Sequence, residues 1–297
     1  MMNEKQSHFD DYYSKIYGER WSDIKSALLI REKQVARVNL FATVPQHNSF
    51  SQHSFLPELV DCFWQTTPPY LPQRAENDLL DVYVMDPGSV FVARALEVQE
   101  GDRVLDMCAA PGGKTLILAQ ALREQGELLA NDLSPERRER LKKVMQQYVP
   151  REIRERFWIR GQDGVQFGLK EPESFDRILL DAPCSGERHL LENEKALKEW
   201  SPRRSEHLAT RQYALLSAAW LALKPGGRLV YSTCTISPQE NDQVIAKLLK
   251  KKKEMVEVVD VPVPFSGAEK TEHGISFMPD KVGFGPLYYS VLIKSEK

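Results

Sequence analysis

The sequence predicts an α/β protein with a doubly wound, mostly parallel sheet of seven strands and an N-terminal helical region. From about residue 100 onward, apolar segments of strand length alternate with segments of helix length, which is typical of a parallel sheet covered on both faces. A glycine-rich turn, Asp106–Thr115, stands directly between the first such strand and a helix. We divide the chain into residues 1–78, a helical region and linker, and residues 79–297, the sheet domain.

In the first segment, apolar residues from Phe9 to about Val60 recur at three- and four-residue steps, which predicts helix. Prolines then predict a linker, because they stop a helix from continuing: Pro57, Pro68, Pro69 and Pro72. A short apolar stretch, Leu79–Met85, follows. Ser89 is an N-cap candidate for a helix that runs to about Val98.

The second segment supplies the strands and helices of the sheet. The predicted strands are Arg103–Met107, Leu128–Leu133, Phe157–Gln162, Phe175–Ala182, Gly227–Thr233, Met255–Val259 and Tyr288–Lys294. The predicted helices are Lys114–Glu124, Pro135–Tyr148, Ser201–Leu223 and Pro238–Lys253. Right-handed crossovers between such strands give a doubly wound sheet, which binds its ligands at the carboxyl ends of the strands. The last strand can insert antiparallel at the edge of the sheet.

Composition narrows the class of protein. Net charge is −2, so nucleic-acid binding must come from local basic patches rather than from bulk charge. Four widely spaced cysteines and no C-x-x-C pair predict free thiols and no metal. No apolar run approaches the ~18 residues of a membrane span, and Glu4, Asp10 and Asp11 argue against an export or transit signal. We therefore expect a cytoplasmic protein without a membrane partner.

The turn Asp106–Thr115 predicts a site for a nucleotide-like ligand. Gly112 and Gly113 let the backbone approach a ligand, and the helix that follows presents unpaired N–H groups. A P-loop needs glycine where Cys108 stands, and the dinucleotide fingerprint G-x-G-x-x-G is absent. A turn whose glycines serve packing alone explains the Gly-Gly pair but not the whole run.

Two acids after the next strands extend this site. Asp132 lies about 20 residues past the glycines, where α/β nucleotide folds place a carboxylate on the ribose hydroxyls. The competing interpretation of Asp132 is the N-cap of the helix at Pro135, but its register with the glycine turn favours ligand binding. Asp163, in Gly161–Gly164, can accept a hydrogen bond from an adenine amino group, although taken alone it is more typical of a turn residue.

Two cysteines follow the fourth and fifth strands of the sheet domain. Cys184 ends Asp181–Cys184, and Cys234 lies in Ser232–Thr235. In a doubly wound sheet these strand ends lie side by side, so both thiols can face one substrate next to the cofactor. Burial in apolar surroundings is the usual fate of cysteine and is the interpretation we give to Cys62 and Cys108. A thiolate is a strong nucleophile, but the residues alone do not say which thiol attacks.

The motifs of this chain, taken together, resemble those of a known family. The Asp106–Thr115 turn, Asn131–Ser134, Asp181–Cys184 and Tyr231–Cys234 are similar, in this order, to the motifs of the Sun-family RNA (cytosine-5) methyltransferases, which use S-adenosylmethionine. Residues shared more particularly with the mitochondrial ribosomal-RNA branch are Phe9-Asp10, Tyr17-Gly18, Trp21 and Phe284–Tyr289. The resemblance implies a Rossmann-like class I methyltransferase fold over roughly Tyr83 to the C-terminus.

The resemblance also implies roles for individual residues. Cys234 adds to C6 of a cytosine, which makes C5 nucleophilic toward the methyl donor, and Cys184 assists release of the product. Asp181 hydrogen-bonds the N3/N4 edge of the base. The cofactor contacts implied are Cys108, Ala109, Ala110, Pro111, Gly112, Gly113, Lys114, Asp132, Asp163, Gly164 and Asp181.

The substrate implied is an unpaired cytosine in folded RNA, with ribosomal RNA favoured over transfer RNA. Candidate phosphate contacts lie just past Cys184 at Arg203, Arg204 and Arg211, where a solvated helix face is an equally good interpretation. Basic residues after the second strand, 137–143, fit a solvated face better. The alternatives are a tRNA cytosine-5 methyltransferase, or an RNA-binding ribosome-assembly factor on the same fold. An amino-methyltransferase is disfavoured because Cys184 stands where an aromatic residue is expected.

Overall fold

The computed structural model describes residues 4–30, 33–43, 55–56, 59–65, 68–252 and 254–296. Its helices are α1 (Glu4–Tyr17), η1 (Gly18–Arg20), α2 (Trp21–Leu29), α3 (Pro87–Arg94), α4 (Gly113–Leu122), α5 (Pro135–Tyr148), α6 (Arg151–Arg154), η3 (Gly164–Gln166), α7 (Phe167–Lys170), α8 (Glu187–Glu192), α9 (Glu194–Glu199), α10 (Pro202–Ala222), α11 (Asp242–Lys252) and α12 (Pro279–Val282). Within these ranges, no helix combines the length and apolar character needed to cross a membrane.

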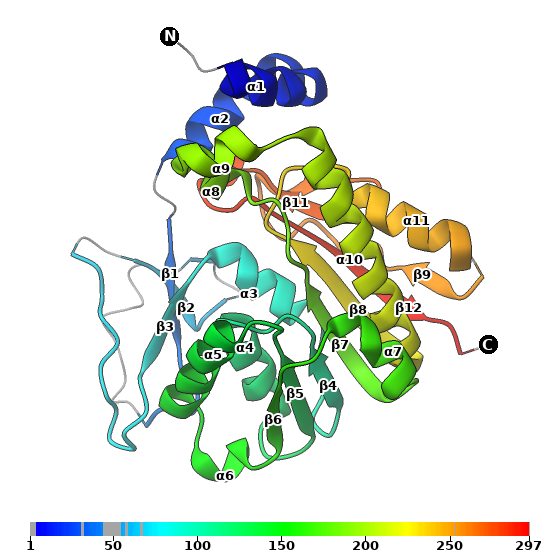
Figure 1. The fold of residues 1–297 in the computed structure, drawn as a ribbon. Coiled ribbons are helices and arrows are strands. Elements are labelled where there is room, and N and C mark those ends of the chain that lie inside the picture. Colours follow the sequence, from blue (N-terminus) through cyan, green and yellow to red (C-terminus); the bar gives the residue numbers. More distant parts are fainter. Residues whose placement is uncertain are drawn as a thin grey trace.

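The strands of the described residues form two sheets (Figure 1). Their bounds are β1 (Val35–Val38), β2 (Cys62–Trp64), β3 (Val82–Met85), β4 (Arg103–Asp106), β5 (Glu127–Asn131), β6 (Phe157–Arg160), β7 (Phe175–Asp181), β8 (Leu223–Thr233), β9 (Val256–Val258), β10 (Glu269–Lys270), β11 (Ile275–Phe277) and β12 (Leu287–Lys294). The larger sheet has nine strands in the order β10-β11-β12-β8-β7-β4-β5-β6, with β9 also paired to β12. The predicted doubly wound α/β fold is confirmed.

All seven predicted strands lie in this larger sheet, and two of its nine strands, β10 and β11, were not predicted. Strands β4 to β8 are parallel, whereas β12 pairs antiparallel with β8. The antiparallel direction predicted for the last strand is correct, but its expected place at the edge is wrong. β9 and β11 both pair with β12 on the side away from β8, so β12 lies inside the sheet.

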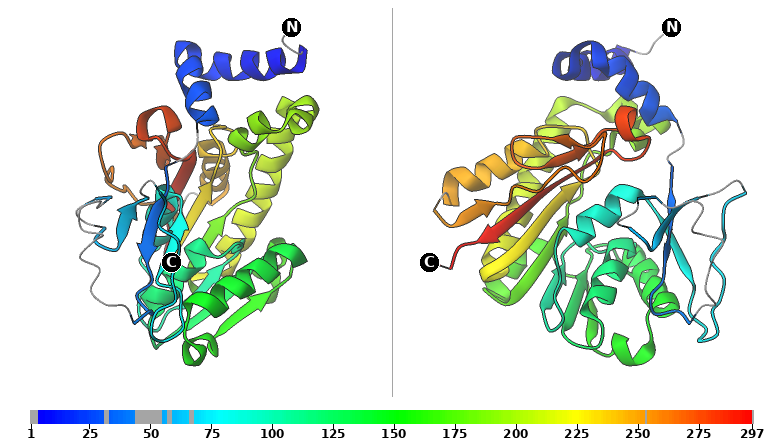
Figure 2. Two further views of the ribbon diagram at one scale, coloured as in Figure 1. Left: turned by 90° about the vertical axis from the view of Figure 1, so that its left-hand side faces the viewer. Right: turned by 180° about the vertical axis from the view of Figure 1, so that it is seen from behind.

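Alternating side chains of the central strands point to opposite faces of the sheet, which is why their sequences are apolar throughout. Val104, Leu179 and Val230 pack with α3, α4 and α5, whereas Leu105, Leu180 and Leu229 pack with α10 and α11. Figure 2 shows helices on both sides of the twisted sheet. The strand ends that carry the predicted motifs emerge between these two helical layers.

The helical prediction for residues 9–60 is correct for α1 and α2 and wrong after Leu29. Val35–Val38 forms β1, which pairs antiparallel with both β2 and β3, and residues 44–54 lie outside the described part of the chain. Pairing with strands distant in sequence overrides the local pattern here. The boundary predicted between residues 78 and 79 stays a prediction; β3 of the second segment pairs with β1 of the first.

The helix α3 begins earlier and ends earlier than predicted. Asp86, not Ser89, is its N-cap: the Asp86 side chain accepts a hydrogen bond from the Ser89 backbone N–H, and Pro87 occupies the first turn. The helix ends at Arg94 rather than near Val98. Pro68, Pro69 and Pro72 lie between β2 and β3, as the linker prediction requires, and Pro57 is outside the described residues.

The first two helices dock on the loops that follow β7 and β8. Phe9 and Tyr13 of α1 pack against Trp200, and Trp21 of α2 belongs to the same apolar cluster. This cluster also contains Leu190 of α8 and Ile236, two residues past Cys234. In Figure 2 these helices lie at one end of the molecule, away from the three-stranded sheet. The N-terminal helices therefore support the segments that carry the predicted cysteines.

Candidate active site

The two predicted thiols lie side by side. Strands β7 and β8 are neighbours, with Asp181 opposite Ser232, so the loops that follow them start together. The Sγ atoms of Cys184 and Cys234 are 2.8 Å apart, and the Cys234 backbone N–H donates to the Cys184 sulfur at 3.2 Å. Both are free thiols. The geometry allows one thiol to act as the hydrogen-bond partner of the other.

The surroundings of the two thiols differ. Cys234 is exposed, whereas Cys184 is half-buried. The hydrogen bond with the Cys234 side chain and burial raise the pKa of the Cys184 thiol far above its usual value, so Cys184 keeps its proton near neutral pH. The more accessible sulfur therefore has a protonated neighbour that can hydrogen-bond a thiolate.

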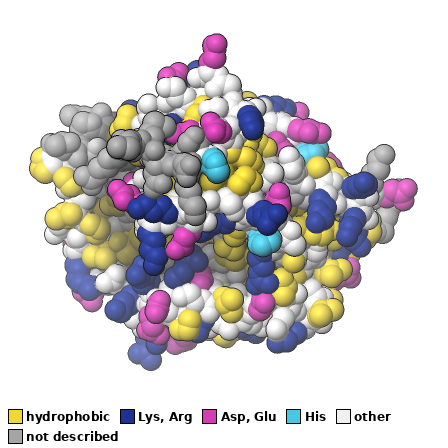
Figure 3. Space-filling view, turned by 45° about the horizontal axis from the view of Figure 1, so that its top comes forward, with side chains coloured by type: hydrophobic (Ala, Val, Ile, Leu, Met, Phe, Trp, Pro, Cys, Tyr) yellow, Lys and Arg dark blue, Asp and Glu magenta, His cyan; other side chains and the backbone are white. Residues whose placement is uncertain are grey.

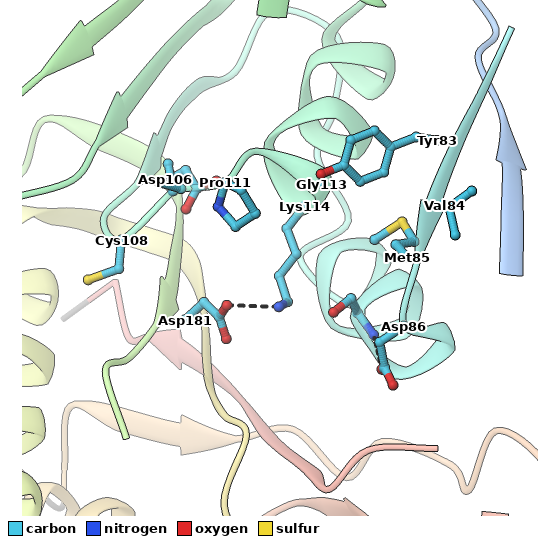
Figure 4. Close-up of a pocket in the computed structure, with 13 residues that line it drawn as sticks. Tyr83, Val84, Met85, Asp86, Asp106, Cys108, Pro111, Gly113, Lys114 and Asp181 are labelled. Carbon is cyan, nitrogen blue, oxygen red and sulfur yellow. Dashed lines mark hydrogen bonds and ion pairs between the residues drawn. The ribbon is translucent and has the colours of Figure 1, made fainter. Parts of the chain in front are cut away.

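Asp181 at the end of β7 forms an ion pair with Lys114 in the first turn of α4. Lys114 Nζ lies 2.8 Å from Asp181 Oδ2, and Ser232 Oγ donates to Asp181 Oδ1 at 2.7 Å. Figure 4 shows the two side chains pointing toward one another across the cavity. Burial lowers the pKa of Lys114, but the Asp181 carboxylate outweighs that effect and raises it. Lys114 therefore keeps its positive charge beside Asp181.

Two adjoining cavities meet at these residues. The larger, about 590 Å³, is lined by Asp132, Gly164, Asp181, Cys184 and Cys234, among others. The smaller, about 220 Å³, is lined by Tyr83, Asp86, Asp106, Lys114 and further residues of the glycine-rich turn (Figure 4). Cys108 and Asp181 line both cavities. A ligand that spans them therefore passes both the turn and the thiols.

Gly112 and Gly113 of the turn, and Gly164 at the larger cavity, are required by backbone conformation or by close approaches. Gly112 has φ +118°, a conformation that side chains other than glycine rarely adopt. A Cβ on Gly113 would lie 2.8 Å from the Tyr83 ring, and one on Gly164 would lie 2.6 Å from Leu215. Burial raises the pKa of Cys108 well above its usual value, which makes its thiol inert at neutral pH.

Comparison with known proteins identifies the family. The family model of the 16S rRNA methyltransferases RsmB/F matches residues 93–293. The 5-cytosine rRNA methyltransferase NSUN4 of Mus musculus is 37% identical over 273 residues, covering 80% of this chain and 71% of that protein. The chain belongs to the RsmB/F (Sun) family of RNA cytosine-5 methyltransferases.

Other relatives extend the range of the family. A mitochondrial tRNA (cytosine(34)-C(5))-methyltransferase of Mus musculus is 31% identical, and the match covers 96% of this chain and 89% of that protein. Among solved structures, NSun6 from Pyrococcus horikoshii with SFG superposes with a TM-score of 0.77 at 20% identity, covering 98% of both chains, which shows the shared fold. As a member of this family, the chain is an RNA methyltransferase that uses S-adenosylmethionine as its methyl donor.

An unpaired buried acid at the smaller cavity fits the amino-acid part of S-adenosylmethionine. Asp106 is buried, its Oδ2 accepts from Thr115 Oγ1 at 2.7 Å, and its Oδ1 has no hydrogen-bond partner. Burial raises the pKa of Asp106 to about 7. No role of its own was predicted for Asp106, although it is the first residue of the turn Asp106–Thr115. An ammonium group here would fill the vacant acceptor.

Asp132 and Asp163 lie at the larger cavity or beside it. Asp132 is buried and accepts from the Ala110 and Ser134 backbone N–H groups. It is not the N-cap of α5: that residue is Ser134, whose side chain accepts from Arg137 N. Asp163 caps η3 and binds Arg211, whose guanidinium lowers the pKa of the Asp163 carboxyl. The proposed ribose and adenine contacts of these acids stay predictions.

The three arginines predicted to contact RNA are in different settings. Arg203 and Arg204 are exposed in the first turn of α10, whereas Arg211, two turns later, pairs with Asp163 beside the cavity. Arg137 pairs with Asp132 and is likewise engaged in the site. Figure 3 shows groups of Lys and Arg side chains on one face of the molecule, with Asp and Glu between them. Arg203 and Arg204 therefore remain the better candidates for phosphate contact.

Proposed function

We propose that this chain methylates C5 of a cytosine in ribosomal RNA through a transient covalent bond between Cys234 and C6 of the base. The observation that supports it best is the contact between the two thiols, 2.8 Å from sulfur to sulfur, at the cavity that Asp132 and Asp181 line. Family membership and the rRNA methyltransferase names among the relatives support the substrate. S-adenosylmethionine, held by the turn 108–114, Asp106 and Asp132, supplies the methyl group.

The reaction divides into steps for the protein's own residues. The Cys234 thiolate adds to C6, and the electron pair of the C5–C6 double bond becomes available at C5 for the new carbon–carbon bond. Asp181, oriented by Lys114 and Ser232, hydrogen-bonds the N3/N4 edge. After methylation, C5 loses its proton to a base and Cys234 leaves as the thiolate, which restores the double bond.

Cys184 is suited to the second half of this sequence. Its thiol keeps its proton mainly because of the hydrogen bond with Cys234. Once the Cys234 sulfur is bonded to carbon, it no longer carries the charge that opposes ionisation of Cys184, so the pKa of Cys184 falls. Cys184 then loses its own proton to solvent, and the resulting thiolate accepts the C5 proton, directly or through a water, so that release follows.

The test compares three cysteine variants. Cys234→Ala is expected to abolish methyl transfer to RNA, and Cys184→Ala to accumulate a covalent RNA–protein adduct visible as a slower band in denaturing electrophoresis. Cys62→Ala is the control, because Cys62 is buried outside the site. Full methyl transfer by Cys234→Ala would overturn the assignment of the nucleophile.

Bisulfite sequencing of total RNA with and without the protein distinguishes ribosomal RNA from transfer RNA as the substrate. The tRNA alternative is favoured by the mitochondrial tRNA relative, which matches the chain over 96% of its length. A protected cytosine in a ribosomal RNA loop supports the proposal, and one confined to a tRNA replaces it.

We also propose the cytoplasm as the compartment, supported by four cysteines that are all free thiols.

A further inference from the structure

Beneath the two thiols lie two buried carboxyl groups, Glu187 and Glu240, each with no solvent exposure. Glu187 begins α8, three residues after Cys184, and Glu240 precedes α11, six residues after Cys234. Within the described part of the chain, neither carboxyl pairs with a Lys, Arg or His side chain. Two carboxyl groups without a cation are costly to bury, so their hydrogen bonds must explain their presence.

Each carboxyl holds the loop of the other cysteine. Glu187, on the Cys184 segment, accepts from Thr235 Oγ1 at 2.7 Å and from the Ile236 backbone N–H at 3.0 Å, the two residues that follow Cys234. Glu240, on the Cys234 segment, accepts from the Ser185 backbone N–H at 3.0 Å, the residue that follows Cys184. The two loops are therefore cross-linked by reciprocal hydrogen bonds at the residues that follow the thiols.

Two further elements complete the network. Gln212 of α10 donates to Glu240 Oε2 at 2.8 Å and to the Pro183 carbonyl at 2.9 Å, which fixes the residue before Cys184. Tyr13 of α1 donates its hydroxyl hydrogen to Glu187 Oε1 at 2.7 Å. We call this set, Glu187, Glu240, Ser185, Thr235, Gln212 and Tyr13, the carboxyl brace.

The hydroxyl of Ser185 connects the two acids. Ser185 Oγ lies 2.9 Å from Glu187 Oε1 and also hydrogen-bonds Glu240 Oε1. A hydroxyl has one hydrogen, so it can donate to only one of the two oxygens. If both carboxyls were ionised, the other contact would set an anionic oxygen against a lone pair. A proton on Glu240 resolves this, because Glu240 then donates to Ser185 and Ser185 donates to Glu187.

We propose that Glu187 and Glu240 form a buried carboxyl pair that shares one proton through Ser185, and that this carboxyl brace positions Cys184 and Cys234 for the reaction, with Tyr13 of the N-terminal helix as a member. Glu187 is the ionised member, since three donors besides Ser185 point at it. The brace residues are positioning residues, and the inference rests on the proposed roles of the two cysteines.

The surroundings of Glu240 agree with this assignment. Burial raises the pKa of Glu240, and the charge of Glu187 adds to the effect. The titratable groups that face it are Glu187 of α8, Tyr12 and Tyr13 of α1, Tyr231 of β8 and Cys184. All of these are acids or neutral at pH 7, so none supplies a positive charge. The folded state therefore binds the Glu240 proton more tightly than the unfolded state does.

The first test measures the thermal unfolding midpoint of the full chain from pH 5 to pH 9. Because the folded-state pKa of Glu240 is raised, its contribution to stability is present at low pH and is lost as pH rises through that pKa. Glu240→Gln mimics the protonated acid and lacks this loss, so its midpoint relative to wild type should rise by about 3 °C with increasing pH. Asp86 and Asp106 are present in both proteins, so their titration cancels in this difference.

The control is Glu192→Gln, which removes an exposed carboxylate from the same helix as Glu187. Its midpoint should stay at a constant offset from wild type over the whole pH range. A constant offset for Glu240→Gln as well would overturn the shared proton.

The second test measures turnover. Glu187→Gln should lower kcat about tenfold with KM for RNA and for S-adenosylmethionine within twofold, since the thiols move but the other residues that line the cavity do not. Glu192→Gln should match wild type. If Glu187→Gln fails to fold, Tyr13→Phe takes its place in this test, because that change removes only a single donor to Glu187. An unchanged kcat, or an effect on KM alone, would overturn the positioning role.

A wild-type protein without methyltransferase activity would refute the proposed function, whereas the pH-dependent midpoints would still decide whether the carboxyl pair shares a proton.

Discussion

The loops after β7 and β8 have acids on both sides, in opposite electrostatic settings. On the cavity side, Asp181 pairs with the Lys114 ammonium at 2.8 Å. On the underside, Glu187 and Glu240 accept hydrogen bonds from hydroxyl, amide and backbone donors, and no cation in the described chain pairs with them. The acid that lies beside the thiols in the cavity is paired with a cation. Acids that only hold loops are stabilised by several neutral donors.

The two settings also differ in their response to a lost partner. A partly exposed ion pair contributes little net stability, but removing one member leaves the other charge without compensation. A carboxyl held by neutral donors loses one hydrogen bond at a time, each worth about 1 kcal/mol. We therefore expect changes on the cavity side to affect chemistry strongly and single changes in the carboxyl brace to affect it in small steps.

The largest effect is expected from Asp181→Asn. This change removes the carboxylate from the base edge and leaves Lys114 as an unpaired cation in the cavity, so kcat should fall by about 100-fold or more. Methyl incorporation into RNA under single-turnover conditions measures it. The matched control is Asp176→Asn, which breaks the Asp176–Lys224 pair near the start of the same strand and should leave kcat within twofold. Turnover of Asp181→Asn within a few-fold of wild type would contradict the distinction between the two sides.

A smaller, pH-dependent effect is expected at Asp106. Its pKa is raised to about 7 by burial, so its contribution to folding stability is lost as pH rises through that value, whereas its ability to bind an ammonium group is gained. The dissociation constant for S-adenosylmethionine should therefore be roughly tenfold higher at pH 6 than at pH 8. Isothermal titration calorimetry measures it.

The control ligand for Asp106 is 5′-methylthioadenosine, which lacks the amino-acid part and should bind with little dependence on pH. Asp106→Asn should bind S-adenosylmethionine more weakly and without this pH dependence. An unaltered pH profile in Asp106→Asn would show that the vacant Oδ1 acceptor does not bind the cofactor.

What could be predicted from the sequence follows the same division. The parallel strands β4 to β8, the turn Asp106–Thr115 and the adjacency of Cys184 and Cys234 depend on local patterns and on the order of parallel strands, both of which a sequence displays. β1 could not be predicted because it is defined by pairing with β3, and Val35–Val38 carries no signal for that partner. The carboxyl brace was missed for the same reason: Tyr13 and Glu187 are 174 residues apart. The charge of a single glutamate in a sequence does not reveal that it is buried.

The smallest effect is expected from Tyr13→Phe, which tests the carboxyl brace from the side of the N-terminal helix. The change removes one of the donors to Glu187 while the ring keeps its packing against Trp21 and Trp200. Thr235, Ile236 and Ser185 remain, so kcat should fall only about two- to fourfold, with KM unchanged. Tyr17→Phe is the matched control on the same helix, because the Tyr17 hydroxyl donates to the Ile236 carbonyl rather than to a carboxyl. If both variants lowered kcat equally, the helix would act through packing alone; a deficit confined to Tyr13→Phe would link the N-terminal helix to the thiols through Glu187.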